Sequence, residues 1–270
     1  MLADWIYTHP ISIVGSLVVG LFVLLSLAGL AIVHNLVPVK SRRAHNDIVG
    51  FTIAVIGVVY AVLLAFIAIV AWETFRKADN IVGSEANYVG DIFRNTIGLP
   101  DDLARGLRGR LGDYVDVVIA QEWPAQQAGR LDDSVWQKGW TILADFHADI
   151  ARFRPANAGE AVVQGQLLRG LSGLYDARRG RLLAAQEHIN KVIWWIIALG
   201  AMLTVGSTYL FGPPSVIMHA VITAMLAASL GFVVVLIVAH DYPFRGTPSV
   251  SDEAFRAVQK NMGGYSFRQQ

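Results

Sequence analysis

Long apolar stretches alternate with charged stretches along this chain and set its main elements. Four segments are almost wholly apolar: Ile11–Val33, Ile48–Trp72, Val192–Phe211 and Ser215–Ala239. The first three contain no charged residue, and the fourth contains only His219. A helix rises about 1.5 Å per residue, so each segment reaches the length that a hydrocarbon core of about 30 Å requires. The pattern therefore predicts four membrane-spanning helices.

A charged region separates the second apolar segment from the third. Residues 73–191 hold 31 of the 43 charged side chains, 15 of them basic and 16 acidic. The strings GLPDD (98–102), EWPAQQAG (122–129) and RPANAG (154–159) divide this region into four pieces with helical periodicity. No piece shows the alternation that is typical of a strand. The region is therefore predicted to form a water-exposed bundle of helices.

The bundle is predicted to be continuous with two of the spans. No Pro or Gly interrupts the chain between Val58 and Val82, so one helix should leave the second span and enter the bundle. The last bundle helix, roughly Glu160 to His188, should run on into the third span, where Lys191 and two tryptophans suit a membrane boundary. The expected fold class is all-α, with four transmembrane helices and a helical bundle inserted between the second and third.

Four parts follow from this reading of the chain. They are a first transmembrane hairpin at residues 1–72 with spans at about 11–34 and 48–72, the extramembrane bundle at 73–191, a second transmembrane hairpin at 192–240, and a C-terminal tail at 241–270.

Composition supports a membrane location. The chain is 54% hydrophobic and only 16% charged, with a mean hydropathy of +0.46, which is too apolar for an ordinary soluble domain. The formal net charge of +1 provides no general attraction to nucleic acid. Because the chain has no cysteine, disulfides and thiolate chemistry are excluded.

The second apolar segment carries a stripe of small residues. When the helix is projected at about 100° per residue, one face carries Gly50, Ala54, Gly57, Ala61 and Ala65. Small residues let helix backbones approach closely in lipid, where packing replaces the hydrophobic effect as the driving force. This face is predicted to pack against a neighbouring helix or subunit.

A second stripe on the same helix changes from apolar to polar. It passes through Val62, Phe66, Ile69, Glu73, Asn80 and Asn87. The first three would form a hydrophobic pore constriction, Glu73 its charged rim, and the two asparagines the lining of a hydrated vestibule. The alternative is that the apolar part faces lipid and the polar part faces water. Four spans cannot enclose a pore alone, so a channel would require a symmetric homo-oligomer.

Two further groups of charged residues lie near the predicted membrane boundary. Asp241 and Arg245 follow the last span, four residues apart, and are interpreted as a clamp that holds the tail against the bundle or a neighbouring subunit. Arg178, Arg179 and Arg181 could neutralise anionic lipid or concentrate anions at a pore mouth, and the lipid-facing role is favoured.

No pattern of residues points to catalysis, a cofactor or a metal. The adjacent carboxylates Asp101 and Asp102 would not converge on one substrate. His34 and His45 lack the spacing of metal ligands, and no phosphate-binding glycine loop or nucleophile elbow is present. The chain is therefore expected to be neither an enzyme nor a metal- or cofactor-binding protein.

The basic residues give two opposing signals about the side of the membrane on which the bundle lies. The loop between the first two spans carries Lys40, Arg42 and Arg43, which would place that loop in the cytoplasm and the bundle outside. Seven basic residues flank the spans on the bundle side: Arg76, Lys77, Arg178, Arg179, Arg181, Lys191 and Arg245. Their number and proximity favour a cytoplasmic bundle.

Several strings resemble the bacterial bestrophin-like domain family. They are HNDIVGFTIAVIGVVYAVLLAFIAIVAWETF, EANYVGDIFR, LPDD, YVDVVIAQEWP, LYDARRGRLLAAQEHINKVIWWIIALGA and DYPFRG, in this order between His45 and Arg245. More distantly, the chain resembles the bestrophins, which are homo-oligomeric anion channels with four spans per subunit, a pore lined by the second span and a cytoplasmic helical part. The second span lacks the run of prolines of a bestrophin neck, so that feature is not implied.

Together, the residues and the resemblance favour an oligomeric bestrophin-like ion channel in the bacterial cytoplasmic membrane. The expected partners are the lipid bilayer, further copies of the chain and inorganic ions, with no nucleic acid. The alternative is a non-conducting membrane scaffold or sensor whose helical bundle binds a protein partner.

Overall fold

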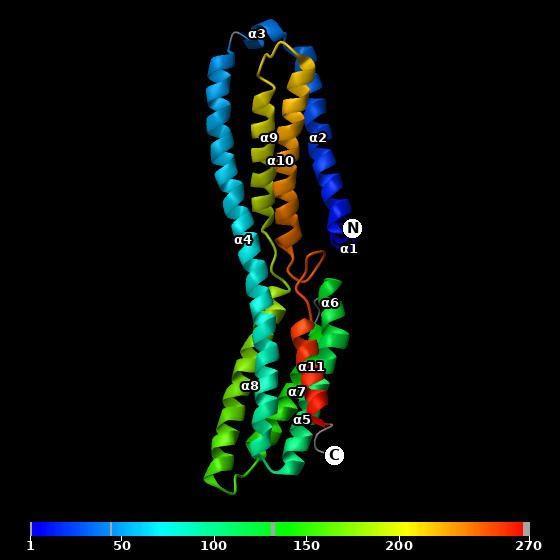
Figure 1. Cartoon of the computed structure of the whole chain (residues 1–270), viewed down its shortest axis with the longest axis vertical. Coiled ribbons are helices and arrows are strands. Elements are labelled where there is room, and N and C mark those ends of the chain that lie inside the picture. Colours follow the sequence, from blue (N-terminus) through cyan, green and yellow to red (C-terminus); the bar gives the residue numbers. More distant parts are fainter. Residues whose placement is uncertain (1, 44, 131–132, 267–270) are drawn as a thin grey trace. The chain divides into compact units, whose positions relative to one another are not determined.

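The fold is built from helices. A computed structural model describes residues 2–43, 45–130 and 133–266, and no strand occurs among these residues. In chain order the helices are α1 (Leu2–Thr8), α2 (Ile11–Leu36), α3 (Val39–Arg43), α4 (Asn46–Asn95), the 3₁₀ turn η1 (Thr96–Gly98), α5 (Asp101–Val117), the π-helical turn η2 (Val118–Glu122), α6 (Trp123–Gln127), α7 (Asp133–Arg152), α8 (Ala158–Ala184), α9 (Lys191–Thr208), α10 (Val216–Asp241) and α11 (Glu253–Ser266) (Figure 1).

The chain folds as two compact units, each with its own interior. The first unit is formed by the residues up to Glu73 together with His188–Tyr242 and Gly246–Pro248. The second is formed by Thr74–Glu187, Pro243–Arg245 and the residues from Ser249 on. Only α4 contributes a long stretch of one helix to both.

Within the described residues, four helices are long and apolar enough to cross a membrane: α2, α4, α9 and α10. The most apolar window of each is only 11% to 33% buried within the chain. Apolar side chains exposed to this extent are unfavourable in water, but lipid or neighbouring subunits accommodate them. Figure 1 shows α9 and α10 running beside α2 in the first unit.

Glycines let the helices of the first unit approach one another closely. A Cβ added to Gly231 of α10 would lie 3.1 Å from the Cα of Val19 of α2. On α9, Gly200 leaves space for the ring of Tyr60 of α4, whose hydroxyl donates a hydrogen bond to the Ile197 carbonyl at 2.6 Å. These contacts are of the small-residue type that membrane helices use in place of hydrophobic burial.

Arg42 fastens the connection before α4 to the end of α9. Its Nη1 donates to the carbonyl oxygens of Tyr209, at 3.0 Å, and Phe211, at 3.3 Å. Its Nη2 lies 3.2 Å from Nδ1 of His34, which must accept because a guanidinium has no lone pair to offer. Arg42 is buried. A cation beside carbonyls that a helix end leaves unpaired is electrostatically favourable, so this basic residue has a structural task.

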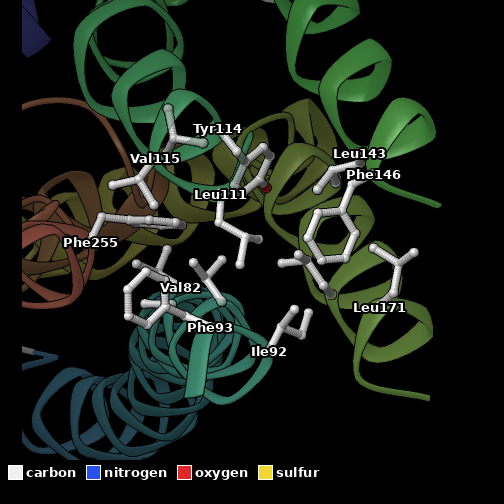
Figure 2. Packing of buried hydrophobic residues seen from close by; sticks show 14 of the residues in the cluster. Val82, Ile92, Phe93, Leu111, Tyr114, Val115, Leu143, Phe146, Leu171 and Phe255 are labelled. Atoms are coloured by element: carbon white, nitrogen blue, oxygen red, sulfur yellow. The ribbon is translucent and has the colours of Figure 1, made fainter. Parts of the chain in front are cut away.

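The second unit has a continuous apolar core. α4, α5, α7, α8 and α11 each contribute buried side chains to it, among them Ile92, Leu111, Phe146, Leu171 and Phe255. Figure 2 shows these side chains converging between the helices. Residues 241–270 were expected only as a tail, but Phe255 is fully buried, so α11 is part of the bundle's core.

The string EWPAQQAG was expected to separate two helical pieces, but the chain stays helical through most of it. From Asp101 the helix continues through η2 to Gln127 and breaks only after that residue, where Gly129 has a φ of +67°. The wider π-helical turn ends at Glu122, two residues before Pro124, whose ring an uninterrupted α-helix would not accommodate.

The predicted passage of one unbroken helix from the bundle into the third apolar segment is wrong. α8 ends at Ala184 and α9 begins at Lys191, and residues 185–190 are not helical. The side chain of Asn190 accepts a hydrogen bond from the Val192 N–H at 2.9 Å and so caps the start of α9. An N-cap residue has extended backbone angles, which end the helical geometry on its N-terminal side. α4, by contrast, is one helix over its 50 residues.

We predict that Gly200→Ala will destabilise the first unit, because the added methyl would overlap the Tyr60 ring and displace its hydroxyl from the Ile197 carbonyl. Overpacking of this kind costs about 1–3 kcal/mol. Thermal unfolding of the purified protein in detergent measures the loss. Gly206→Ala on the same helix is the matched control, because a Cβ there would have no heavy atom within 4 Å. Equal melting temperatures for the two variants would contradict the prediction.

Candidate functional site

The residues predicted to form a pore constriction lie on an uncovered face of α4. Val62 is 50% exposed, Phe66 64% and Ile69 52%. The opposite face of the same stretch is covered, because Tyr60 and Leu64 are buried against α9 and α10 in the second apolar cluster of the chain. Within a single chain, the candidate stripe therefore points away from the other helices of its own unit.

The small-residue stripe of α4 is largely unused within the chain. A Cβ on Gly50 would lie 3.4 Å from the ring of Phe211, but a Cβ on Gly57 would meet nothing within 4 Å. Ala54, Ala61 and Ala65 are exposed. Apart from its first position, the stripe is therefore largely uncovered by the part of the chain that the structure describes.

Beyond the apolar stretch, the polar continuation of the stripe is also on the surface. Glu73, Asn80 and Asn87 are exposed. In the second unit the two asparagines border a groove of about 550 Å³, whose lining is Asp79, Asn80, Val82, Gly83, Ser84, Asn87, Ser251, Glu253 and Ala254. The structure thus places the predicted vestibule residues on a polar, water-accessible surface of α4 and the start of α11.

A cluster of four buried charges lies inside the second unit. Glu85 of α4, Glu122 of η2 and both Arg178 and Arg181 of α8 are fully buried, with 0% exposure each. The cluster contains two positive and two negative groups, so its charges balance. This arrangement corrects the expected lipid-facing role of Arg178 and Arg181, since their side chains point into the bundle. Arg179, between them, stays exposed and pairs with Asp176 at 3.0 Å.

Arg178 binds Glu122 with both ends of its guanidinium. Its Nη2 donates to Glu122 Oε1 at 2.7 Å and its Nη1 to Oε2 at 2.9 Å. Nη2 also donates to the Trp136 carbonyl at 2.9 Å, and the guanidinium carbon lies 4.7 Å from the ring centroid of Trp140. This two-pronged geometry and the cation–π contact are the strongest forms that such pairing takes.

Arg181 bridges the carboxylates of Glu85 and Glu122. Its Nε donates to Glu85 Oε2 at 2.6 Å, and its Nη2 donates to Glu85 Oε1 at 3.1 Å and to Glu122 Oε2 at 2.7 Å. The hydroxyl of Tyr114 donates to Glu85 and accepts from Arg178. Through these bonds α4, α5, η2, α7 and α8 are connected by one polar network.

The charges of the cluster hold one another in their ionised forms. Burial alone would raise the pKa of the Glu122 carboxyl, but Arg181 and Arg178 outweigh burial and hold this pKa below its ordinary value. Burial alone would lower the pKa of the Arg181 guanidinium, but Glu85 and Glu122 raise it well above its ordinary value. Burial raises the pKa of Tyr114, and the charge of Glu85 raises it further, so the phenol stays protonated and can donate.

Gly139 leaves the space that the cluster occupies. A Cβ on this residue of α7 would lie 2.6 Å from Glu122 Oε1 and would overlap the guanidinium of Arg178. Because that Cβ would meet the charged ends of two buried side chains, we infer that only glycine fits at this position without rearranging the pair.

The heptad spacing of the helices contains the signal that could have revealed this cluster. On α8, Leu167, Leu171 and Leu174 are buried at intervals of four and three, and Arg178 and Arg181 continue those intervals. On α4, the buried residues Ala78, Val82, Glu85, Val89 and Ile92 follow the same rhythm. A charged residue at a core position of a helical repeat is expected to be buried and paired rather than lipid-facing.

The two members of the predicted tail clamp have separate surroundings. Asp241 accepts hydrogen bonds from the Ile189 N–H, at 2.6 Å, and from the Tyr7 hydroxyl, at 3.0 Å, and so holds α1 and the segment before α9 to the end of α10. The Arg245 guanidinium lies against Gly129, where a Cβ would come 2.9 Å from its central carbon.

His219 is buried and its Nε2 donates to the Thr208 carbonyl at 2.9 Å.

We predict that acid will destabilise the bundle through Glu122. Because its pKa is lower in the folded than in the unfolded chain, its contribution is complete above about pH 4.5 and is lost as pH falls through the folded pKa. Glu122→Gln should lower stability at pH 7 by about 3–5 kcal/mol, since it leaves buried arginine unpaired. It should also lose less stability than the wild type does below pH 4.5. Melting temperatures from pH 7 to pH 3 test both effects, with Asp113→Asn on the exposed face of α5 as control. A parallel fall for wild type and Glu122→Gln would contradict the prediction.

Comparison with known proteins identifies the family. A model of the bestrophin-like domain matches residues 20–255. A variant of a bacterial bestrophin homologue from Klebsiella pneumoniae is 15% identical, with a TM-score of 0.66 over 90% of this chain and 98% of that one. Another crystal structure of the Klebsiella pneumoniae homologue is 15% identical, with a TM-score of 0.65 over 90% and 96% of the two chains. No curated protein matches the chain. The structural likeness, at these identities, shows a shared fold, and because the family model covers most of the sequence, the chain belongs to the bestrophin-like domain family.

Proposed function

We propose that several copies of this chain assemble into an ion channel in a bacterial cytoplasmic membrane, with α4 of each copy lining a central pore. One observation carries the proposal. The exposed stripe of α4 is apolar at Val62, Phe66 and Ile69 and polar at Glu73, Asn80 and Asn87, and it lies opposite the face that packs against its own chain.

Helix geometry supports this opposition. At about 100° per residue, the six stripe residues fall within an arc of about 60°. On the same projection, Tyr60, Leu64, Val82 and Val89, which are buried, lie on the far side of the helix. A helix with one side packed in its own subunit and the other side open is able to line a pore, which supports this role for α4.

The remaining exposed face of α4 supplies a subunit contact. Four spans per chain cannot surround a pore, so the wall must come from a closed ring of copies. Ala54, Ala61 and Ala65 lie beside the pore stripe and are exposed, and a Cβ on Gly57 would meet nothing within 4 Å. Small residues let the α4 helix of one copy approach a helix of the next closely in lipid.

The chemistry of the stripe defines the proposed path for ions. Val62, Phe66 and Ile69 would form a dehydrated constriction, and Glu73 would place a ring of negative charge at its edge. Asn80 and Asn87 would line a vestibule in which ions keep their water. A closed ring of carboxylates attracts cations and repels anions, so we expect cations to pass more readily. Exposed basic residues that flank the spans, such as Arg76, Lys77 and Lys191, favour a bundle on the cytoplasmic side.

The groove on the bundle surface supports a second candidate function. It is polar and open, and it draws residues from both α4 and the segment that begins α11. In a non-conducting scaffold or sensor, this surface would bind a protein partner, and the apolar part of the α4 stripe would face lipid. Electrical recording from the reconstituted protein separates the two functions.

We predict that Phe66→Ala will raise the current through reconstituted protein severalfold at a fixed voltage, because it widens the apolar constriction. Planar bilayer recordings of wild type and variant measure the change. Leu24→Ala on the exposed face of α2 is the control for removing apolar surface elsewhere in the first unit. Wild-type protein without current over a range of pH, calcium concentration and voltage would favour the scaffold.

We predict that Glu73→Gln will reduce the preference for cations over anions. A unit charge at 4 Å is worth about 1 kcal/mol in water, so the permeability ratio should fall about fivefold when the ring is neutralised. Reversal potentials in asymmetric salt measure the ratio. The difference from wild type should shrink in concentrated salt, which screens exposed charges. Asp101→Asn, an exposed change at the start of α5, is the control, and an unchanged ratio in Glu73→Gln would exclude this residue from the rim.

A further inference from the structure

The buried charge cluster contains one residue of α4, and that residue is unique in its part of the helix. Glu85 is the only carboxylate on α4 between Asp79 and Asp91. The other charged residues on the bundle half of the helix are exposed, whereas Glu85 is fully buried. If α4 slid or turned by a few residues, no other acid could therefore replace Glu85 opposite Arg181.

The apolar packing of α4 is far less demanding. Its buried face in the bundle includes Ala78, Val82, Ala86 and Val89. Small aliphatic side chains pack without directional bonds, so a modest rotation of the helix could exchange one for another. The bonds from Arg181 Nε and Nη2 to the two oxygens of Glu85 fix both distance and direction.

A mispaired cluster would be costly. Rotation of α4 by one residue would turn Glu85 through about 100° and leave Arg181 with a single carboxylate in a site that excludes water. Removing one partner of a buried ion pair is strongly destabilising, and a polar residue at one core position of a helical repeat is a well-attested way to specify register.

We infer that the Glu85–Arg181 pair is a positioning lock that sets the rotation of α4 about its axis. With Glu85 turned inward, Asn80, Ser84 and Asn87 are turned outward. The same helix continues without interruption through Ile69, Phe66 and Val62, so a rotation that is carried along α4 would also turn the residues of the proposed constriction. Its consequence for conduction rests on the proposed function, whereas its effect on helix rotation does not.

Cysteine labelling can test the lock directly, because the natural sequence contains no cysteine. Single substitutions would be made along α4 at Lys77, Asp79, Asn80, Ser84, Asn87 and Tyr88, all of them exposed. The rate of modification by a charged maleimide is then measured at each position in the otherwise wild-type protein and in Glu85→Gln. Oligomeric state and melting temperature are recorded for every sample.

We expect Glu85→Gln to shift the labelling pattern around the helix. Positions on one side of the helix should label faster, and those on the other side should label more slowly. The ratio of the labelling rates on the two sides should change about tenfold or more as alternative rotations gain population. A protein that is merely loosened would label faster everywhere. Ile150→Ala, which leaves a cavity in the core on α7 away from the charges, is the matched control. It should label faster at all positions to a similar extent.

The double variant Glu85→Leu with Arg181→Met adds a second criterion. It leaves Arg178 and Glu122 as a balanced pair, so its melting temperature should recover relative to Glu85→Leu alone. Its labelling pattern should stay shifted, because Leu and Met restore apolar packing but form no directional bond that fixes the rotation of α4. An unshifted pattern in both Glu85→Gln and the double variant would overturn the lock, even if the wild type conducts. A shifted pattern in a protein that carries no current would support the lock and reject the proposed channel.

Discussion

The bundle depends on a balance of charge in its interior. Two arginines and two glutamates are completely removed from water, and their charges balance through the pairs Arg178–Glu122, Arg181–Glu122 and Arg181–Glu85. The loss of any one would leave an uncompensated charge in a low-dielectric site. Since the four groups come from α4, η2 and α8, and the Trp136 carbonyl of α7 accepts from Arg178, the balance holds only when these helices take one relative arrangement.

Glycine makes room for the large side chains that join the helices in both units. Gly139 admits the Arg178–Glu122 pair, and Gly200 admits the Tyr60 ring whose hydroxyl reaches a backbone carbonyl of α9. In each case a bulky group forms directional bonds across a helix interface, and a missing Cβ on the facing helix provides the space. The helices of this protein are therefore joined by a few specific polar contacts as well as by apolar packing.

The sequence was informative where a property depended on a run of neighbouring residues. Length and hydropathy were enough to find the four apolar helices, and the absence of Pro and Gly between Val58 and Val82 was enough to predict that α4 continues unbroken. Pairing between distant segments was not accessible in this way. Glu85 and Arg181 are 96 residues apart in the sequence. Taken by themselves, the adjacent arginines Arg178 and Arg179 suggest a surface cluster. Only the spacing of the buried leucines before them, continued to Arg178 and Arg181, indicates burial. The break before α9 was missed because a single cap residue, Asn190, decides it.

A pore-facing side chain and a lipid-facing one are both uncovered in a single chain, as Phe66 is. The length of α4 is more informative. Its 50 residues rise about 75 Å, more than twice the thickness of a hydrocarbon core of about 30 Å, so a large part of the helix must lie in water. The change from apolar to polar occurs at Trp72 and Glu73 without a change of face. Packing accounts for this shared azimuth, because Tyr60, Leu64, Val82 and Val89 keep one side of α4 covered along its length. A pore that widens into a hydrated vestibule needs the same alignment, and the continuous stripe is what extends the proposed lining from the apolar part into the polar part.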